Sequence, residues 1–127
     1  PYQLTEGPYC TVIGIFQNQY DRNKPLTVVR PGNQSRRFTH INDTIKVCYE
    51  AWKLKKCRHY SISHKQSFTI LEVARMFGRK IKFLKKRPGE RYASALTNMS
   101  LSNKVHKRFG KTSIKKYVED YVKNSHF

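Results

Sequence analysis

The sequence lacks the features that mark several large classes of protein. It has no apolar run approaching about 18 residues, so no transmembrane helix is predicted and we expect no membrane partner. It shows no basic start followed by an apolar stretch, and we therefore expect no secretory signal and a cytoplasmic protein. Acidic residues are few: 8 stand against 26 lysines and arginines, which gives a formal net charge of +18. Such an excess is typical of proteins that bind polyanions, with nucleic acid as the usual partner.

Cysteine is also scarce, and its spacing excludes the common cysteine frameworks. The three cysteines, Cys10, Cys48 and Cys57, are an odd number and include no C-x-x-C pair. A zinc site would need His59 or His64 to join Cys57, and no second nearby cysteine supports it. We interpret the cysteines as reduced thiols of a cytosolic protein.

No familiar catalytic motif is present. The sequence contains no G-x-S-x-G, H-E-x-x-H or Walker loop, and its 6 glycines are isolated, so it has no dinucleotide-binding fingerprint. Tyr-x-x-x-Lys occurs at Tyr20 and at Tyr49, in both cases at the end of an expected helix, and we interpret both as chance. We assign His40, at the end of an expected strand, a structural role. We therefore expect no catalytic residue and no metal ligand in this chain.

The hydrophobic pattern, by contrast, is well developed. With 127 residues the chain fits one domain, and its helical and alternating segments are interleaved, which predicts a small mixed α/β domain over residues 1–127. Helices are expected over 9–20, 69–77 and 114–122, and a further one runs from Ser100 or Ser102 to Phe109. Another expected helix begins at Asn42 or Asp43, and its apolar face consists of Ile45, Cys48, Tyr49 and Trp52. The expected strands cover 26–29, 36–40, 59–62 and 81–84.

One helix start is marked strongly. Thr69 and Glu72 stand at capping-box spacing, and Gly78 is placed to end the same helix.

The basic residues fall into two kinds. Arginines gather beside two Pro-Gly turns, and Arg36 and Arg87 are the candidates for binding phosphate, because a guanidinium held by a turn offers a fixed fork of donors. From the chemistry alone, a phosphate role and a solvated surface remain equally open for this pair. The scattered lysines are interpreted as a solvated surface.

Several strings together resemble a known family. They are PYQLTEGPYCTVIGIF (1–16), PLTVV (25–29), QSRRFTHIND (34–43) and RPGER (87–91). In order and spacing they resemble the C-terminal half of NAD-dependent nucleotide-sugar epimerases and dehydratases, the extended short-chain dehydrogenases/reductases typified by UDP-glucose 4-epimerase.

The resemblance implies a specific division of labour. NAD and a Tyr-x-x-x-Lys acid/base pair would belong to an N-terminal Rossmann half, and this chain would be a fragment that binds the nucleotide-sugar, a UDP-sugar, without turnover of its own. Arg36 and Arg87 would bind the diphosphate, and the strand with Leu26 and Val28 would line the base pocket. The full-length enzyme would be a homodimer, and an apolar surface of this chain would lie bare where it meets the Rossmann half. Arg37 and Asn98 depart from the family pattern, which commonly has Asp at both positions.

Two other interpretations remain. The charge, with tyrosines and phenylalanines between basic residues, would also fit a small nucleic-acid-binding domain, although no recognition motif is present. A non-catalytic interaction protein of the same fold is the third.

Overall fold

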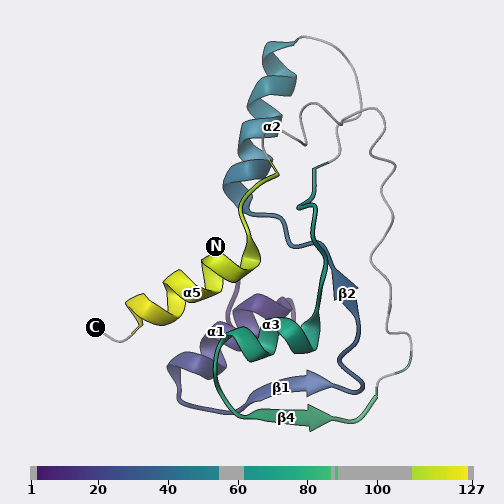
Figure 1. Ribbon diagram of the computed structural model, residues 1–127, viewed down its shortest axis with the longest axis vertical. Coiled ribbons are helices and arrows are strands. Elements are labelled where there is room, and N and C mark those ends of the chain that lie inside the picture. The colour runs from purple at the N-terminus through teal and green to yellow at the C-terminus, as the bar shows by residue number, and fades with distance from the viewer. Residues whose placement is uncertain (1–2, 55–61, 87, 89–109, 126–127) are drawn as a thin grey trace.

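The described residues of this computed structural model are 3–54, 62–86, 88 and 110–125. They form a small mixed α/β fold, which confirms the predicted class (Figure 1). The helices are α1 (Val12–Asp21), α2 (Ile41–Lys53), α3 (Ile70–Met76) and α5 (Ile114–Asn124). The strands are β1 (Leu26–Val29), β2 (Ser35–Arg36), β3 (Phe68–Thr69) and β4 (Ile81–Leu84).

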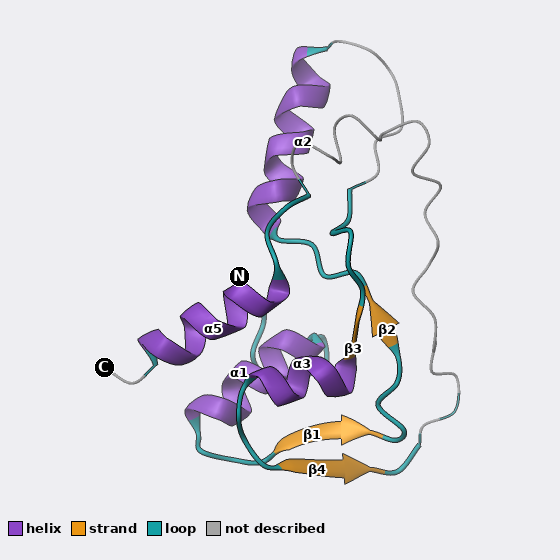
Figure 2. Ribbon diagram, in the orientation of Figure 1, coloured by secondary structure: helices purple, strands orange, loops and turns teal. Residues whose placement is uncertain are grey.

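The strands form two small sheets. β1 and β4 run parallel, with Leu26 opposite Ile81 and Val29 opposite Leu84, and α1 and α3 lie against them (Figure 2). β2 and β3 pair antiparallel, with Arg36 opposite Phe68. Parallel neighbours require a long connection, and here it runs through β2, α2, β3 and α3.

An aromatic cluster joins the helices over the β1–β4 sheet. Phe16 and Phe77 are 0% and 2% exposed, and their ring centroids lie 5.9 Å apart in an edge-to-face arrangement. Tyr20 and Tyr121 add rings at 5.9 Å and 6.3 Å from Phe77. The apolar stripes predicted for α1 and α5 therefore meet in one core, together with α3.

The predicted boundaries of α3 are confirmed. The Thr69 backbone N–H donates to Glu72 Oε2 at 2.7 Å, and the Glu72 N–H donates to Thr69 Oγ1 at 3.1 Å, which completes a capping box. The bond from the Thr69 backbone holds the pKa of the Glu72 carboxyl below its ordinary value. Gly78 follows the helix at φ +67°, a conformation that L side chains rarely adopt.

The predicted start of the first helix is wrong by a few residues. Instead of beginning at Tyr9, α1 begins at Val12 with Thr11 as its N-cap. The preceding segment crosses the helix at Gly14, where a Cβ atom would lie 2.1 Å from the Leu4 carbonyl oxygen. This close approach explains why the first turn of α1 carries a glycine.

The predicted second strand is also shorter than expected. Pairing ends at Arg36, and His40 is the N-cap of α2. The His40 Nδ1 accepts the Asn42 N–H at 3.1 Å. The prediction of Asn42 or Asp43 as the N-cap was therefore wrong. The Asp43 carboxylate instead accepts the Thr112 backbone N–H at 3.0 Å and connects α2 to the segment before α5.

The apolar face predicted for α2 exists, but it faces outward. Helix α2 stands away from the β1–β4 layer (Figure 1), and its buried side chains are Asp43 and Val47. Tyr49 and Trp52 are 53% and 73% exposed and stack with their centroids 5.9 Å apart. An exposed apolar stripe of this kind is uncommon on a soluble domain, and the predicted bare surface stays a prediction.

The remaining sequence predictions divide into two groups. Every lysine in the described ranges is exposed, and the solvated-surface interpretation of the scattered lysines stays a prediction. Within the same ranges, no helix has the length and apolar character needed to cross a bilayer. The predictions that lie wholly or mostly outside the described residues are the strand at 59–62, the helix ending at Phe109, and the roles of Cys57, Arg87 and Asn98.

Candidate functional site

A pocket of about 260 Å³ opens between α1, the edge of β1 and β2. Most of its lining is apolar, and the polar side chains come from Thr27, Gln34 and Arg36. The apolar lining residues are Val12, Ile15, Phe16, Val29, Ile70 and Leu84. Such a combination, an apolar wall with a few polar groups and one charge, is characteristic of small-molecule sites.

Strand β1 presents two different faces. Leu26 and Val28 are 0% and 1% exposed and belong to the core, so their side chains leave no surface for a ligand. Thr27 and Val29, the alternate residues, line the pocket. The strand predicted to line the base pocket is therefore present, but the side chains at the pocket are those of Thr27 and Val29, not those of Leu26 and Val28.

The backbone of β1 alternates in the same way. Leu26 N–H donates to the Lys80 carbonyl at 2.8 Å and Arg30 N–H to the Leu84 carbonyl at 3.0 Å, so these groups face β4. The N–H and C=O groups of Thr27 and Val29 therefore face the opposite edge, toward α1 and the pocket. That edge offers backbone donors and acceptors next to an apolar wall.

The turn after β1 carries the chain to Arg36. Gly32 in this turn has φ +79°, and a Cβ atom there would lie 2.8 Å from Val28 Cγ1 and 3.2 Å from Leu71 Cβ. The turn is thus packed against the core, and it fixes where β2 begins. Arg36 is half-buried at the pocket, and its Nη1 donates to the Ser35 carbonyl at 2.8 Å. A cation held in this way at the rim is suited to bind an anionic group.

Arg87 lies outside the described residues and follows shortly after Leu84, which lines the pocket.

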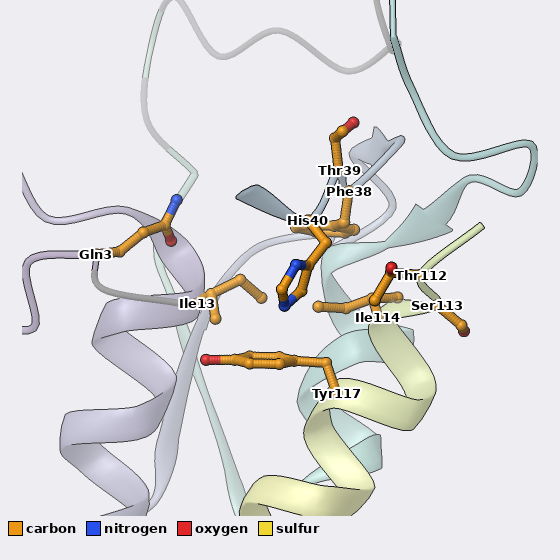
Figure 3. A pocket seen from close by; sticks show the side chains of 9 residues that line it. All are labelled: Gln3, Ile13, Phe38, Thr39, His40, Thr112, Ser113, Ile114 and Tyr117. Atoms are coloured by element: carbon orange, nitrogen blue, oxygen red, sulfur yellow. The ribbon is translucent and has the colours of Figure 1, made fainter. Parts of the chain in front are cut away.

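A second pocket, of about 60 Å³, lies between the segment before α2 and the start of α5 (Figure 3). The His40 ring lies over the Tyr117 ring, with centroids 5.9 Å apart, and Gln17 Nε2 donates to the Tyr117 hydroxyl at 2.9 Å. Burial lowers the pKa of His40 below its ordinary value of 6.5. This pocket is much smaller than the one beside β1, which favours the latter as the site for a larger ligand.

Neither a metal nor NAD fits the described residues. They contain no group of three or more His, Cys, Asp or Glu side chains able to hold a metal ion. A dinucleotide site requires a glycine-rich turn between a strand and a helix of a larger parallel sheet. The described parallel sheet has two strands, and the sequence has no such glycine pattern.

Sequence reasoning missed Thr27, Val29 and Gln34 as lining residues. The signal for the first two was available, because alternate residues of a strand face opposite sides and Leu26 and Val28 are the stronger core candidates. For Gln34 the sequence offered no signal beyond its place in a turn.

Comparison with known proteins supplies the family context. No protein-family model matches the sequence, and no curated protein matches it. Many solved structures are similar, and in the three described next the chain spans 42%, 41% and 43% of their respective lengths.

The first of these structures is UDP-glucuronic acid 4-epimerase from Bacillus cereus in complex with UDP-glucuronic acid and NAD, with 26% identity over 94% of this chain and a TM-score of 0.73. The second is UDP-N-acetylglucosamine 4-epimerase from Methanobrevibacter ruminantium in complex with UDP-N-acetylmuramic acid, with 21% identity over 99% and a TM-score of 0.79. The third is dTDP-glucose 4,6-dehydratase from Bacillus anthracis in complex with NAD, with 19% identity over 96% and a TM-score of 0.65.

The chain therefore has the fold of a part of the extended short-chain dehydrogenases/reductases. It is similar to the NAD-dependent nucleotide-sugar epimerases and dehydratases, and the matched share of about two fifths is consistent with their C-terminal half. This confirms the resemblance seen in the sequence.

Proposed function

We propose that the chain is the nucleotide-sugar-binding part of an NAD-dependent epimerase or dehydratase. The observation that carries this proposal is the composition of the 260 Å³ pocket, which joins an apolar wall, an open strand edge and Arg36. A nucleoside diphosphate needs these three elements in that order: a surface for its base, groups that hydrogen-bond the base edge, and a cation for the phosphates.

Each part of the ligand would then have its own contacts. The base lies against the apolar wall, and its edge hydrogen-bonds to the Thr27 carbonyl and to the Val29 N–H and carbonyl, which face away from β4. The Thr27 N–H already donates to Gln19 Oε1 at 2.9 Å. The diphosphate lies at Arg36 and, by the resemblance, at Arg87, where two guanidinium forks neutralise its charge. The named neighbours bind UDP-glucuronic acid and UDP-N-acetylmuramic acid, which favours a UDP-sugar as the ligand.

The chemistry of such an enzyme would come from elsewhere. NAD, where bound, accepts and returns a hydride, and two of the neighbours contain it. The described residues contain no glycine-rich turn of a dinucleotide site, so we infer that the chain's own residues would bind and orient the nucleotide-sugar. We therefore infer that the isolated chain has no epimerase activity of the UDP-glucose 4-epimerase kind. By the resemblance, we also propose that the complete enzyme is a cytoplasmic homodimer.

The test is thermal unfolding of the 127-residue chain with millimolar UDP. Binding to the folded state raises the melting temperature, and about 2.7 kcal/mol of stabilisation is expected when the ligand is present at about 100 times its Kd. Inorganic pyrophosphate and uridine, each carrying half of the recognised groups, should give smaller shifts. A chain that ignores UDP but binds DNA with a steep salt dependence would instead be a nucleic-acid-binding domain.

A further inference from the structure

One side chain of α1 holds the pocket edge of β1 through two bonds. Gln19 Oε1 accepts the Thr27 backbone N–H at 2.9 Å, and Gln19 Nε2 donates to Thr27 Oγ1 at 2.7 Å. The backbone N–H can only donate, so it fixes the amide orientation: the oxygen faces the N–H and the nitrogen faces the hydroxyl. Both bonds reach the same residue, which lines the pocket.

The direction of the second bond determines what the hydroxyl can do. An amide NH₂ group donates and does not accept, so the Thr27 oxygen is the acceptor in its bond with Gln19. The hydroxyl proton of Thr27 is then left to point elsewhere. On a side chain that lines the pocket, this proton is available to an acceptor atom of a bound molecule.

We propose that Gln19 is a positioning residue that turns the Thr27 hydroxyl into a hydrogen-bond donor for an oxygen of the bound nucleotide. This inference rests on the proposed function, because it concerns the same pocket. Gln19 does not line the pocket itself, and it acts through Thr27. The pair would thus select for ligands that place an oxygen acceptor beside β1.

The substitution Gln19→Glu distinguishes this positioning role from a purely structural role in holding the strand. Gln19→Glu keeps an oxygen to accept the Thr27 N–H, so the strand remains tethered. A carboxylate cannot donate, however, and the Thr27 hydroxyl would rotate to donate to it. The variant therefore preserves the tether while removing the donor from the pocket.

The experiment is a double-mutant cycle on the 127-residue chain with UDP, measured by calorimetry. The four proteins are the wild type, Gln19→Glu, Thr27→Val and the double variant. Each single substitution should weaken UDP binding by about five- to tenfold, the effect of one lost hydrogen bond. The double variant should bind no more weakly than either single one, because both remove the same donor.

Two further variants serve as controls. Asn18→Asp adds the same charge at the neighbouring position of α1, where the side chain bonds the exposed Glu6 at 3.0 Å, and should leave UDP affinity within about twofold. Thr27→Ser keeps a hydroxyl and should recover most of the affinity that Thr27→Val loses. Unchanged melting temperatures of Gln19→Glu and Thr27→Ser verify that the strand stays in place.

Two outcomes overturn the inference while leaving the proposed function intact. The first is that Gln19→Glu binds UDP with wild-type affinity. The second is that Gln19→Glu lowers the UDP affinity of the Thr27→Val protein by as much as it lowers that of the wild type, which would indicate an effect of the added charge. If the wild-type chain itself does not bind UDP, the proposed function fails and this inference fails with it.

Discussion

Replacing Arg36 by alanine should weaken the binding of UDP but not that of uridine. Arg36 lies at the rim of the pocket, half-buried, with Nη1 already oriented by the Ser35 carbonyl at 2.8 Å. A hydrogen bond to a charged group contributes about 1.5–3 kcal/mol, and the partial exposure of Arg36 favours the lower end of that range. The affinity for UDP should therefore fall about tenfold.

The choice of ligands and substitutions isolates the phosphate contact. Uridine has no phosphate, so its weaker binding should be the same in wild type and Arg36→Ala. Arg36→Lys keeps the charge but loses the planar fork, and its affinity for UDP should lie between the other two. Titration calorimetry with UDP, and nuclear magnetic resonance titration with uridine, measure both affinities on one set of proteins.

Two results would refute this reasoning. If Arg36→Ala lost affinity for UDP and uridine equally, Arg36 would be supporting the pocket wall and not the phosphates. If it lost affinity for neither ligand, the diphosphate would lie elsewhere. Raising the salt concentration gives a further check, since the difference between wild type and Arg36→Ala should shrink as the charge is screened.

Three more predictions concern the fold. Asp43→Ala should lower the free energy of unfolding by about 2 kcal/mol, because it leaves the Thr112 N–H without its acceptor. Asp43→Asn keeps an acceptor oxygen and should lower the free energy of unfolding less, and urea denaturation compares the two variants. The pKa of His40 is lowered in the folded chain, so the unfolded state binds its proton more readily, and stability should fall as the pH drops below 6.5, an effect that His40→Asn should reduce. Trp52 is 73% exposed, so Trp52→Ser should reduce binding of an apolar dye without lowering the melting temperature, and an unchanged dye signal would mean that α2 is not the bare surface.

The elements that the sequence predicted well are those whose evidence is local. The capping box of Thr69 and Glu72, the left-handed Gly78 and the stripe of α5 depend on residues within a few positions of one another. Their physics is that of a single helix end or a single helix face, and tertiary contacts did not alter it.

The parts that were missed depend on contacts between distant segments. Asp43 is a residue type that favours the N-cap position. Its carboxylate instead accepts the backbone N–H of Thr112, which lies far along the chain, and His40 caps the helix. The outward direction of the α2 stripe had no local signal either, because a face that meets another surface and a face that fills a core have the same pattern.

The candidate site was predicted in part for the same reason. Arg36 was identified from chemistry and from resemblance, and it lies at the pocket. Leu26 and Val28 were named for their strand, whereas the pocket takes the alternate residues, and Gln19 contributes through bonds to Thr27 that no spacing in the sequence indicates.

The most direct test of the central claim is a nuclear magnetic resonance titration of the 127-residue chain with UDP, following the backbone amides. We predict that the largest shifts occur at Val29, whose N–H faces away from β4, and at its pocket neighbours Thr27 and Arg36. The amides around His40 and Tyr117 in the smaller pocket should change little. Shifts confined to the smaller pocket or to the exposed lysines, or no saturable shift at millimolar UDP, would contradict it.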